Sequence, residues 1–194
     1  MADAFHVLSQ DHEEVKRMLT ELENGPTQAA GATEEQLRER KKLTERLIIE
    51  ESKHEAVEEE YFWPAVRDAV PDGNRLADEA TGQEQEGKVV LDRLDKLDPA
   101  DREFEELLAA FITAGRAHIA FEEERVWPAL RQVLSASAVE ELGTLLIRGK
   151  DLAPTRPHPN TPPKPGILKA AGPAVGAADR VRDAVTGRGR TEAQ

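Results

Sequence analysis

The 194-residue sequence predicts an all-α protein in which four helices form a bundle. Helix formers such as Glu, Leu, Ala and Arg dominate the chain, whereas aromatic residues make up only 4% of it. Apolar residues recur at intervals of three and four in successive segments, and turn signals separate those segments. The length suits one domain of ordinary size plus some extra chain, since domains mostly run to about 100 to 150 residues.

Two expected helices in the first part of the chain carry polar residues on their inward faces. The first has the stripe Phe5, Leu8, His12, Val15, Leu19 and Leu22. A capping box of Thr33 and Gln36 then opens a helix from about 34 to 70, broken near Pro64. Its inward row reads Leu47, Glu51, His54, Glu58, Tyr61 and Ala65.

Three more helices are expected after the turn at Pro71, Asp72 and Gly73. The inward row of the third helix is Leu76, Ala80, Glu84, Gly87, Leu91, Leu94 and Leu97, so Glu84 replaces an expected Leu. The fourth helix starts at Asp98, Pro99 and Asp101, with the proline at the first helical position. It carries Leu108, Phe111, Gly115, His118 and Glu122 in register. A short fifth helix is expected from Ser137, with Glu140 as its capping partner, to about Ile147.

The composition changes at about residue 151, which divides the chain into a domain over 1–150 and a tail over 151–194. Six prolines fall between Ala153 and Pro165, and the tail has a net charge of +3 against −15 for the rest. Residues 167–185 could form a weak Ala-rich helix, but glycines interrupt it. We therefore expect a flexible Pro/Ala/Gly-rich tail that stays off the bundle and could engage a protein partner.

The charge and composition exclude several classes of function. A net charge of −12 argues against nucleic-acid binding by the main domain, and small molecules or cations are the expected partners. The chain has no cysteine, so His and carboxylates must hold any metal. There is no leader-like apolar stretch and no apolar run of about 18 residues, so no membrane span is expected. A cytoplasmic protein is the simplest expectation.

The second and fourth helices contain an internal repeat. HEAVEEEYFWPAVRD at 54–68 and HIAFEEERVWPALRQ at 118–132 agree at nine of fifteen positions without a gap. Both place His and Glu at positions i and i+4, one turn apart on the same helical face. Each half of the bundle therefore presents one imidazole and one carboxylate inward.

These inward polar groups indicate a metal site, because an ionised carboxylate in an apolar core costs several kcal/mol unless it is paired or binds a metal. The complete set of predicted ligands is His12, His54, Glu58, Glu84, His118 and Glu122. Three His and three carboxylates at one level match the way helix bundles build di-iron sites. Mixed N and O donors suit iron, manganese or zinc more than calcium or magnesium. Glu58 and Glu122 are the natural bridging carboxylates.

Simpler interpretations stand beside this one. A single inward His is more often a core residue with a hydrogen-bond partner, and runs of Glu are usually solvated faces, so a metal-free bundle with salt-bridged helices is the alternative. We interpret the two Trp-Pro pairs as packing and helix-terminating residues. His6, near a helix start, and His158, in the Pro-rich tail, are expected to lie outside the site.

Residues 3–150 resemble the hemerythrin HHE cation-binding family, through DHEEV with His12, HEAVEEEYFWP with His54 and HIAFEEERVWP with His118. The resemblance implies an up-down four-helix bundle with an oxo- or hydroxo-bridged pair of non-haem iron ions. Such a centre binds O₂ or reacts with hydrogen peroxide or nitric oxide. The family's third helix commonly supplies one His, often two spaced by four, whereas Glu84 and Ala80 occupy those positions here.

This departure from the family changes the expected chemistry. An additional carboxylate stabilises ferric iron, and a missing imidazole leaves a coordination position open. We therefore expect an iron protein that reacts with O₂ or reactive oxygen or nitrogen species in stress defence, with catalase-like peroxide removal favoured over reversible O₂ carriage. The alternative is a non-catalytic sensor or binding module for oxygen, nitric oxide or iron.

Overall fold

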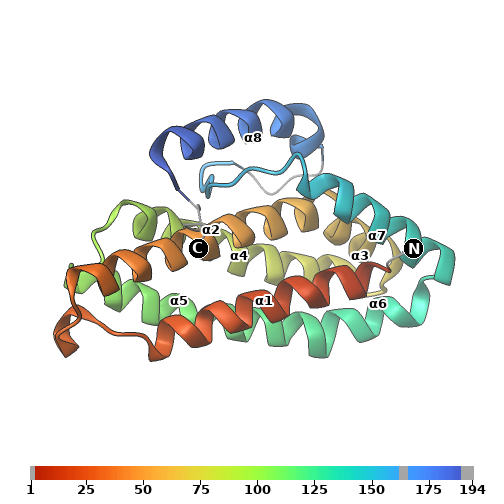
Figure 1. Ribbon diagram of the computed structural model, residues 1–194. Helices are drawn as coiled ribbons and strands as arrows, with labels where there is room; N and C mark the ends of the chain where they lie inside the picture. The colour runs from red at the N-terminus through yellow and green to blue at the C-terminus, as the bar shows by residue number, and fades with distance from the viewer. Residues whose placement is uncertain (1–2, 162–165, 189–194) are drawn as a thin grey trace.

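The computed structural model describes residues 3–161 and 166–188. Four long helical rods run up and down beside one another, with an additional helix at one end and another across one side (Figure 1). The first rod is α1 (Ala4–Asn24), and the third is α4 (Gly73–Lys96). The second rod consists of α2 (Glu34–Val57), η2 (Glu58–Phe62) and α3 (Trp63–Ala69). The fourth consists of α5 (Arg102–Phe121), η3 (Glu122–Val126) and α6 (Trp127–Val133). The remaining elements are η1 (Gln28–Ala30), α7 (Ala136–Lys150) and α8 (Ile167–Thr186). The predicted all-α, up-down bundle is confirmed, and the described residues contain no strand.

The helix starts follow the capping chemistry of the sequence with two corrections. Thr33 and Gln36 form the predicted capping box at the start of α2. Helix α5 begins at Arg102 with Asp101 as its N-cap, so Pro99 precedes the helix and is not its first residue. Helix α7 is capped by Ser135, whose Oγ accepts from the backbone N of Ala138 at 3.2 Å, so the prediction of Ser137 was two residues late.

The two repeats contain matching π-helical segments where the sequence predicted a break. η2 begins at Glu58 and η3 at Glu122, and each is followed by a Trp-Pro pair. The backbone N–H of Trp63 bonds to the carbonyl of Glu58, five residues earlier, and the N–H of Trp127 does the same with Glu122. The proline that follows each tryptophan has no N–H to donate to the helix. The hydrogen-bond spacing therefore widens locally from four residues to five, and the rod continues beyond the proline. The two glutamates thus stand at the point where each rod changes its winding.

The bundle core consists of two apolar clusters with a polar layer between them. On α1, Leu8 belongs to the first cluster and Val15 to the second, and His12 lies between them. On α4, Ala80 and Leu91 belong to the two clusters, and Glu84 lies between them. Burial of each large apolar side chain contributes about 1.5 to 3 kcal/mol, so the two clusters hold the polar layer at a fixed level of the bundle.

The C-terminal segment differs from the expected flexible extension. Residues 167–186 form α8, which lies along the bundle above α2 and α4 in Figure 1. Gly176, which suggested an interrupted helix, allows a close approach instead, because a Cβ there would lie 2.6 Å from the carbonyl oxygen of Leu152. Ala153 is fully buried in the first apolar cluster. The division into a domain over 1–150 and a tail over 151–194 stays a prediction.

A ring of four ion pairs fastens this segment to the bundle, and it joins Asp95 of α4 to Arg156, Asp183 and Arg188. Arg156 contacts Asp95 at 2.9 Å and Asp183 at 2.7 Å. Arg188 contacts Asp95 at 2.8 Å and Asp183 at 3.3 Å. All four side chains are largely buried, so water and salt screen these pairs less than pairs on the open surface. None of the described helices is long and apolar enough to cross a membrane.

Candidate metal centre

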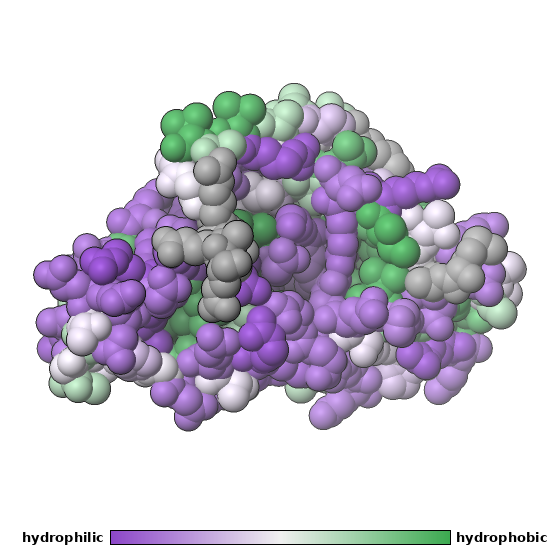
Figure 2. Space-filling view, viewed as in Figure 1, coloured by the Kyte–Doolittle hydropathy of each residue, from purple (hydrophilic) through white to green (hydrophobic). Residues whose placement is uncertain are grey.

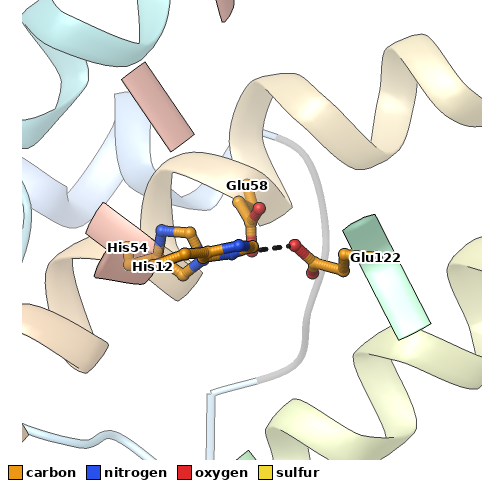
Figure 3. A group of neighbouring side chains, drawn as sticks. All are labelled: His12, His54, Glu58 and Glu122. Atoms are coloured by element: carbon orange, nitrogen blue, oxygen red, sulfur yellow. Dashed lines mark ion pairs between the residues drawn. The ribbon is translucent and has the colours of Figure 1, made fainter. Parts of the chain in front are cut away.

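The polar layer brings all six predicted site residues together. Two overlapping groups form, each with potential ligand atoms within 4.8 Å of one another. The first group is His12, His54, Glu58 and Glu122, shown in Figure 3, and the second is Glu58, Glu84, His118 and Glu122. Glu58 and Glu122 belong to both groups, as expected of carboxylates that bridge two metal ions. All of these side chains are buried except that of His118, which is 13% exposed.

The glutamate carboxylates lie directly against the imidazole rings. Glu122 contacts His12 Nε2 through Oε2 at 3.2 Å and His118 Nε2 through Oε1 at 3.1 Å. Glu58 Oε2 lies 3.2 Å from His54 Nε2, one helical turn earlier on the same rod. Glu122 therefore lies between the two groups, with one oxygen on each side.

The atoms that face the centre of this cluster contact one another but make no hydrogen bond of regular geometry. This holds for Nε2 of all three histidines, for both carboxylate oxygens of Glu58 and Glu122, and for Oε2 of Glu84. Buried polar groups are nearly always hydrogen-bonded, because leaving one unsatisfied costs about 1 to 3 kcal/mol. A concentration of unsatisfied donor atoms at one point is what a metal-binding cluster shows in the absence of its ions, and the residues present fit a pair of ions with N and O ligands.

Each histidine directs its other ring nitrogen to an acceptor outside the cluster. Nδ1 of His12 lies 2.9 Å from Glu123 Oε1, and Nδ1 of His54 lies 3.2 Å from Asp11 Oδ2. Nδ1 of His118 lies 2.9 Å from Gln83 Oε1. Because these partners accept, the single proton of the neutral ring belongs on Nδ1, which leaves the lone pair of Nε2 facing the cluster. Metal-binding histidines are typically oriented by such contacts.

Lysines hold the two carboxylates of this outer layer in place. Lys16 Nζ contacts Glu123 Oε1 at 2.8 Å, and Lys150 of α7 pairs with Asp11. Burial alone would raise the pKa of Asp11, but the hydrogen bonds and charges of His54 and Lys150 outweigh it and lower the pKa. Asp11 therefore stays ionised beside His54. Sequence reasoning missed both carboxylates, although each directly adjoins a predicted ligand in the chain.

The two tryptophans of the repeat contact the site, so their interpretation as packing and helix-terminating residues was incomplete. Trp63 Nε1 donates to Glu84 Oε1 at 2.6 Å. The ring of Trp127 stacks on His12, with centroids 4.9 Å apart and planes 15° apart, and its Nε1 has no partner. Trp63 therefore orients a predicted ligand by a hydrogen bond, whereas Trp127 supports one by ring contact.

The cluster without metal distributes protons among its buried acids and bases. Burial raises the pKa of Glu84 well above its usual range, and the neighbouring Glu58 and Glu55 raise it further. Burial would lower the pKa of His118, but the adjoining Glu122 raises it to about 9. Burial would also raise the pKa of Glu122, but His118 and His12 lower it strongly. Protons on the bases thus supply the positive charge that these carboxylates require.

Two further buried glutamates adjoin the cluster. Glu51 is 8% exposed and interacts electrostatically with His54, His118 and His12, while its burial raises its pKa. Glu55 is 4% exposed, and burial raises its pKa to about 8, so it is protonated at neutral pH. Neither belongs to the two groups of potential ligands among the described residues.

The other two histidines lie outside the cluster, as predicted. His6 is exposed, and its backbone N–H donates to the Asp3 side chain at the start of α1. His158 Nε2 contacts Asp179 Oδ2 at 3.0 Å within the C-terminal segment.

Comparison with known proteins shows the family of this chain. The family model of the hemerythrin HHE cation binding domain matches residues 3–130, and the chain therefore belongs to this family. In fold, the chain is similar to the crystal structure of a hemerythrin HHE cation binding domain-containing protein, the Rv2633c homolog from Mycobacterium kansasii, with a TM-score of 0.64. The two are 24% identical, and the match covers 78% of this chain and 86% of the other. No curated protein matches the chain.

Proposed function

We propose that the cluster holds two non-haem iron ions and that the protein reacts with O₂ or with reactive oxygen or nitrogen species. Removal of hydrogen peroxide in stress defence is the reaction we favour. The observation that carries the proposal is the meeting of three imidazole Nε2 atoms and three carboxylates in two groups that share Glu58 and Glu122. Family membership supports a cation-binding site at this place.

The residues divide into two sets of ligands. His12 and His54 would bind one ion, and Glu84 and His118 would bind the other, with Glu58 and Glu122 shared. Four protein side chains for each ion leave coordination positions open to a small molecule. Iron is the metal we favour for three His and three carboxylates in a helix bundle, and manganese and zinc are the alternatives.

The surrounding residues prepare the site for redox chemistry. When bound, a pair of iron ions supplies reversible electron transfer between its ferrous and ferric states. Asp11 and Glu123 hold the imidazoles of His54 and His12 with Nε2 toward the centre. Trp63 fixes one oxygen of Glu84. The apolar clusters on either side of the layer keep bulk water from the ligands.

A sensor or binding module is the second candidate function, and one contact favours it. The backbone N–H of Gly166, at the start of α8, donates to Glu60 Oε2 at 2.7 Å. Glu60 lies in the π-helical turn that begins at Glu58, so the C-terminal segment contacts the same turn that carries a shared carboxylate. A change at the metal ions could thereby alter the surface that α8 offers to a partner.

The decisive experiment measures metal content and peroxide turnover on one preparation. Full-length protein reconstituted anaerobically with ferrous iron should bind two iron ions per chain and release one O₂ for every two molecules of hydrogen peroxide consumed. His54→Ala should lose both properties, and His6→Ala should keep them. Two bound irons that respond to nitric oxide or O₂ in the optical spectrum without peroxide turnover would favour the sensor. Failure to bind any transition metal would leave the metal-free bundle.

A further inference from the structure

A cavity of about 130 Å³ lies between the bundle and the C-terminal segment. Its floor is formed by α2, η2 and α4, and includes Ser52, Glu55, Ala56 and Lys88. Its roof comes from residues 154–161 and α8, and is mainly apolar, with Pro154, Pro157, Ala171 and Val175. Figure 1 shows α8 and the chain that follows α7 lying over the bundle on this side.

The floor of the cavity is the outer wall of the metal centre. Glu55 lines the cavity and also interacts electrostatically with Glu84 and His118 of the second group of ligands. A Cβ on Gly87 of α4 would lie 3.8 Å from Glu55 Oε1 and 3.6 Å from Phe111, so the Glu55 carboxylate extends from α2 to α4. Glu59, next in sequence to Glu58, lines the cavity as well. One layer of side chains therefore separates the cavity from the second metal position.

The polar atoms of the floor indicate what the cavity can bind. Ser52 is 5% exposed and Glu55 is 4% exposed, and neither Ser52 Oγ nor Glu55 Oε2 has a hydrogen-bond partner. Glu55 Oε2 lies 3.9 Å from Lys88 Nζ, beyond hydrogen-bond distance, and a guest that both donates and accepts hydrogen bonds would satisfy both buried groups.

Charge and size narrow the class of guest. The two described cations of the lining are already paired, Lys88 with Glu59 and Arg156 with Asp95 and Asp183, so they do not favour an anion. A cavity needs roughly 10 to 15 Å³ of such volume to hold one water molecule, so this one has space for several. A small neutral molecule therefore fits, and hydrogen peroxide combines a small size with two donors and two acceptors.

The roof is held on the bundle by contacts that can be removed one at a time. The ring of Asp95, Arg156, Asp183 and Arg188 fastens both parts of the roof, the stretch at Arg156 and the end of α8, to one point of α4. Gln85 Nε2 adds a hydrogen bond to the carbonyl oxygen of Pro159 at 2.6 Å. The size limit of the cavity is therefore set by the C-terminal segment and not by the bundle alone.

We propose that this roofed cavity binds small uncharged hydrogen-bonding molecules beside the metal centre, and that the C-terminal segment excludes larger ones. The delivery of such molecules to metal ions rests on the function proposed above. The selectivity of the cavity by size and charge is independent of that function, because it follows from the roof and the lining.

The internal repeat provides a matched pair of positions for the test. Ala56 lines the cavity two residues after His54, and Ala120 occupies the equivalent place after His118 without lining it. Both side chains are half-buried. The chain has no cysteine, so Ala56→Cys and Ala120→Cys each introduce a single reactive thiol.

The first measurement needs no metal. In metal-free protein, methyl methanethiosulfonate, which is small and uncharged, should modify Ala56→Cys readily. The bulky anion 5,5′-dithiobis(2-nitrobenzoate) should react with this variant much more slowly. The ratio of the rate with the small reagent to the rate with the bulky one should be at least tenfold higher for Ala56→Cys than for Ala120→Cys. Adding Asp183→Asn, which breaks two contacts of the ring, should remove most of this discrimination. Equal reagent ratios at the two positions would overturn the proposed selectivity.

The second measurement uses binding to iron and not turnover. In the ferrous protein, Ala56→Phe should slow the association of nitric oxide at least fivefold by filling the cavity, and Ala120→Phe should leave it within twofold. Val175→Phe fills the same space from the roof and serves if Ala56→Phe does not fold. Unchanged association in a folded cavity-filling variant would overturn the role of the cavity as a route to the metal. If the unmodified iron-loaded protein binds no nitric oxide, the proposed function fails, while the thiol measurement still decides the cavity.

Discussion

The hydrogen bond from Trp63 to Glu84 gives the sharpest quantitative prediction. Trp63→Phe keeps an aromatic ring in the core but removes the Nε1 donor that lies 2.6 Å from Glu84 Oε1. Hydrogen bonds to charged groups contribute about 1.5 to 3 kcal/mol, and 1.4 kcal/mol corresponds to a factor of ten in affinity. We therefore expect the affinity of one of the two metal positions to fall by about 10- to 100-fold, the range typical for residues that orient metal ligands.

Trp127→Phe is the matched control, because the repeat places Trp127 at the equivalent position. Its Nε1 has no partner, and its ring supports His12 only by stacking. The loss of such ring contact costs about 0.5 to 1.5 kcal/mol, so the metal affinity should fall by no more than about tenfold. Both substitutions shrink a buried side chain by similar amounts. The difference in metal affinity between the two variants therefore measures the contribution of the hydrogen bond from Trp63 to Glu84.

The assay is a competitive titration of each variant with ferrous iron against a chelator of known affinity, under anaerobic conditions. Two binding steps should be resolved, and Trp63→Phe should weaken one of them selectively. Equal affinities of the two variants for ferrous iron, or an equal loss of affinity at both binding steps, would show that Trp63 does not act through Glu84.

Three further predictions concern the ligands and their protons. Glu84→Leu should lose iron from one position, whereas Glu84→His should keep two irons with a more hemerythrin-like optical spectrum; two irons and an unchanged spectrum in Glu84→Leu would remove Glu84 from the ligand set. His54→Ala and His118→Ala should each bind less iron than His6→Ala by elemental analysis, and equal retention in all three would contradict the assignment. In the metal-free protein, the pKa of His118 is raised from 6.5 to about 9, so its contribution to stability, roughly 3 kcal/mol, is complete below pH 6.5 and is lost as the pH rises to about 9. Urea denaturation of the metal-free protein should therefore show lower stability at pH 9 than at pH 6, and no such decrease would contradict the pairing with Glu122.

The position of the site was predictable because helical periodicity fixes which side chains face inward. His54 and Glu58, like His118 and Glu122, stand one turn apart on inward stripes, and both pairs meet in the structure. Glu84 could be placed by counting back from apolar residues on its own helix, and it does lie in the polar layer. Spacing along one helix was sufficient for these residues, and their role as ligands is the proposal that follows.

The contacts around the site could not be predicted, because they join helices that are distant in the sequence. His12 and Glu123 are 111 positions apart, and His54 and Asp11 are 43 apart. Glu123 belongs to a run of glutamates that resembles an ordinary solvated face, and only the docking of α1 against η3 gives it a partner. Periodicity shows which residues point inward, but it does not show which residue on another helix they will meet.

The contacts of the C-terminal segment could not be predicted for a related reason. Glycine lowers helix propensity, and Gly176 therefore suggested a broken helix. The reason for a glycine at position 176 is the close packing of α8 against the chain at Leu152, where a side chain would collide with the backbone. The helix is held by this close approach and by buried ion pairs, neither of which has a local sequence signal. Figure 2 shows that apolar surface remains on α8, where Val181 and Val185 are 66% and 82% exposed.

Anomalous diffraction at the iron absorption edge, from crystals of the iron-loaded protein, tests the central claim most directly. We expect two iron peaks in the polar layer, one beside His12 and His54 and the other beside Glu84 and His118, with Glu58 and Glu122 between the two. A single peak, peaks away from this layer, or no iron peak in crystals grown with excess ferrous iron would contradict the claim.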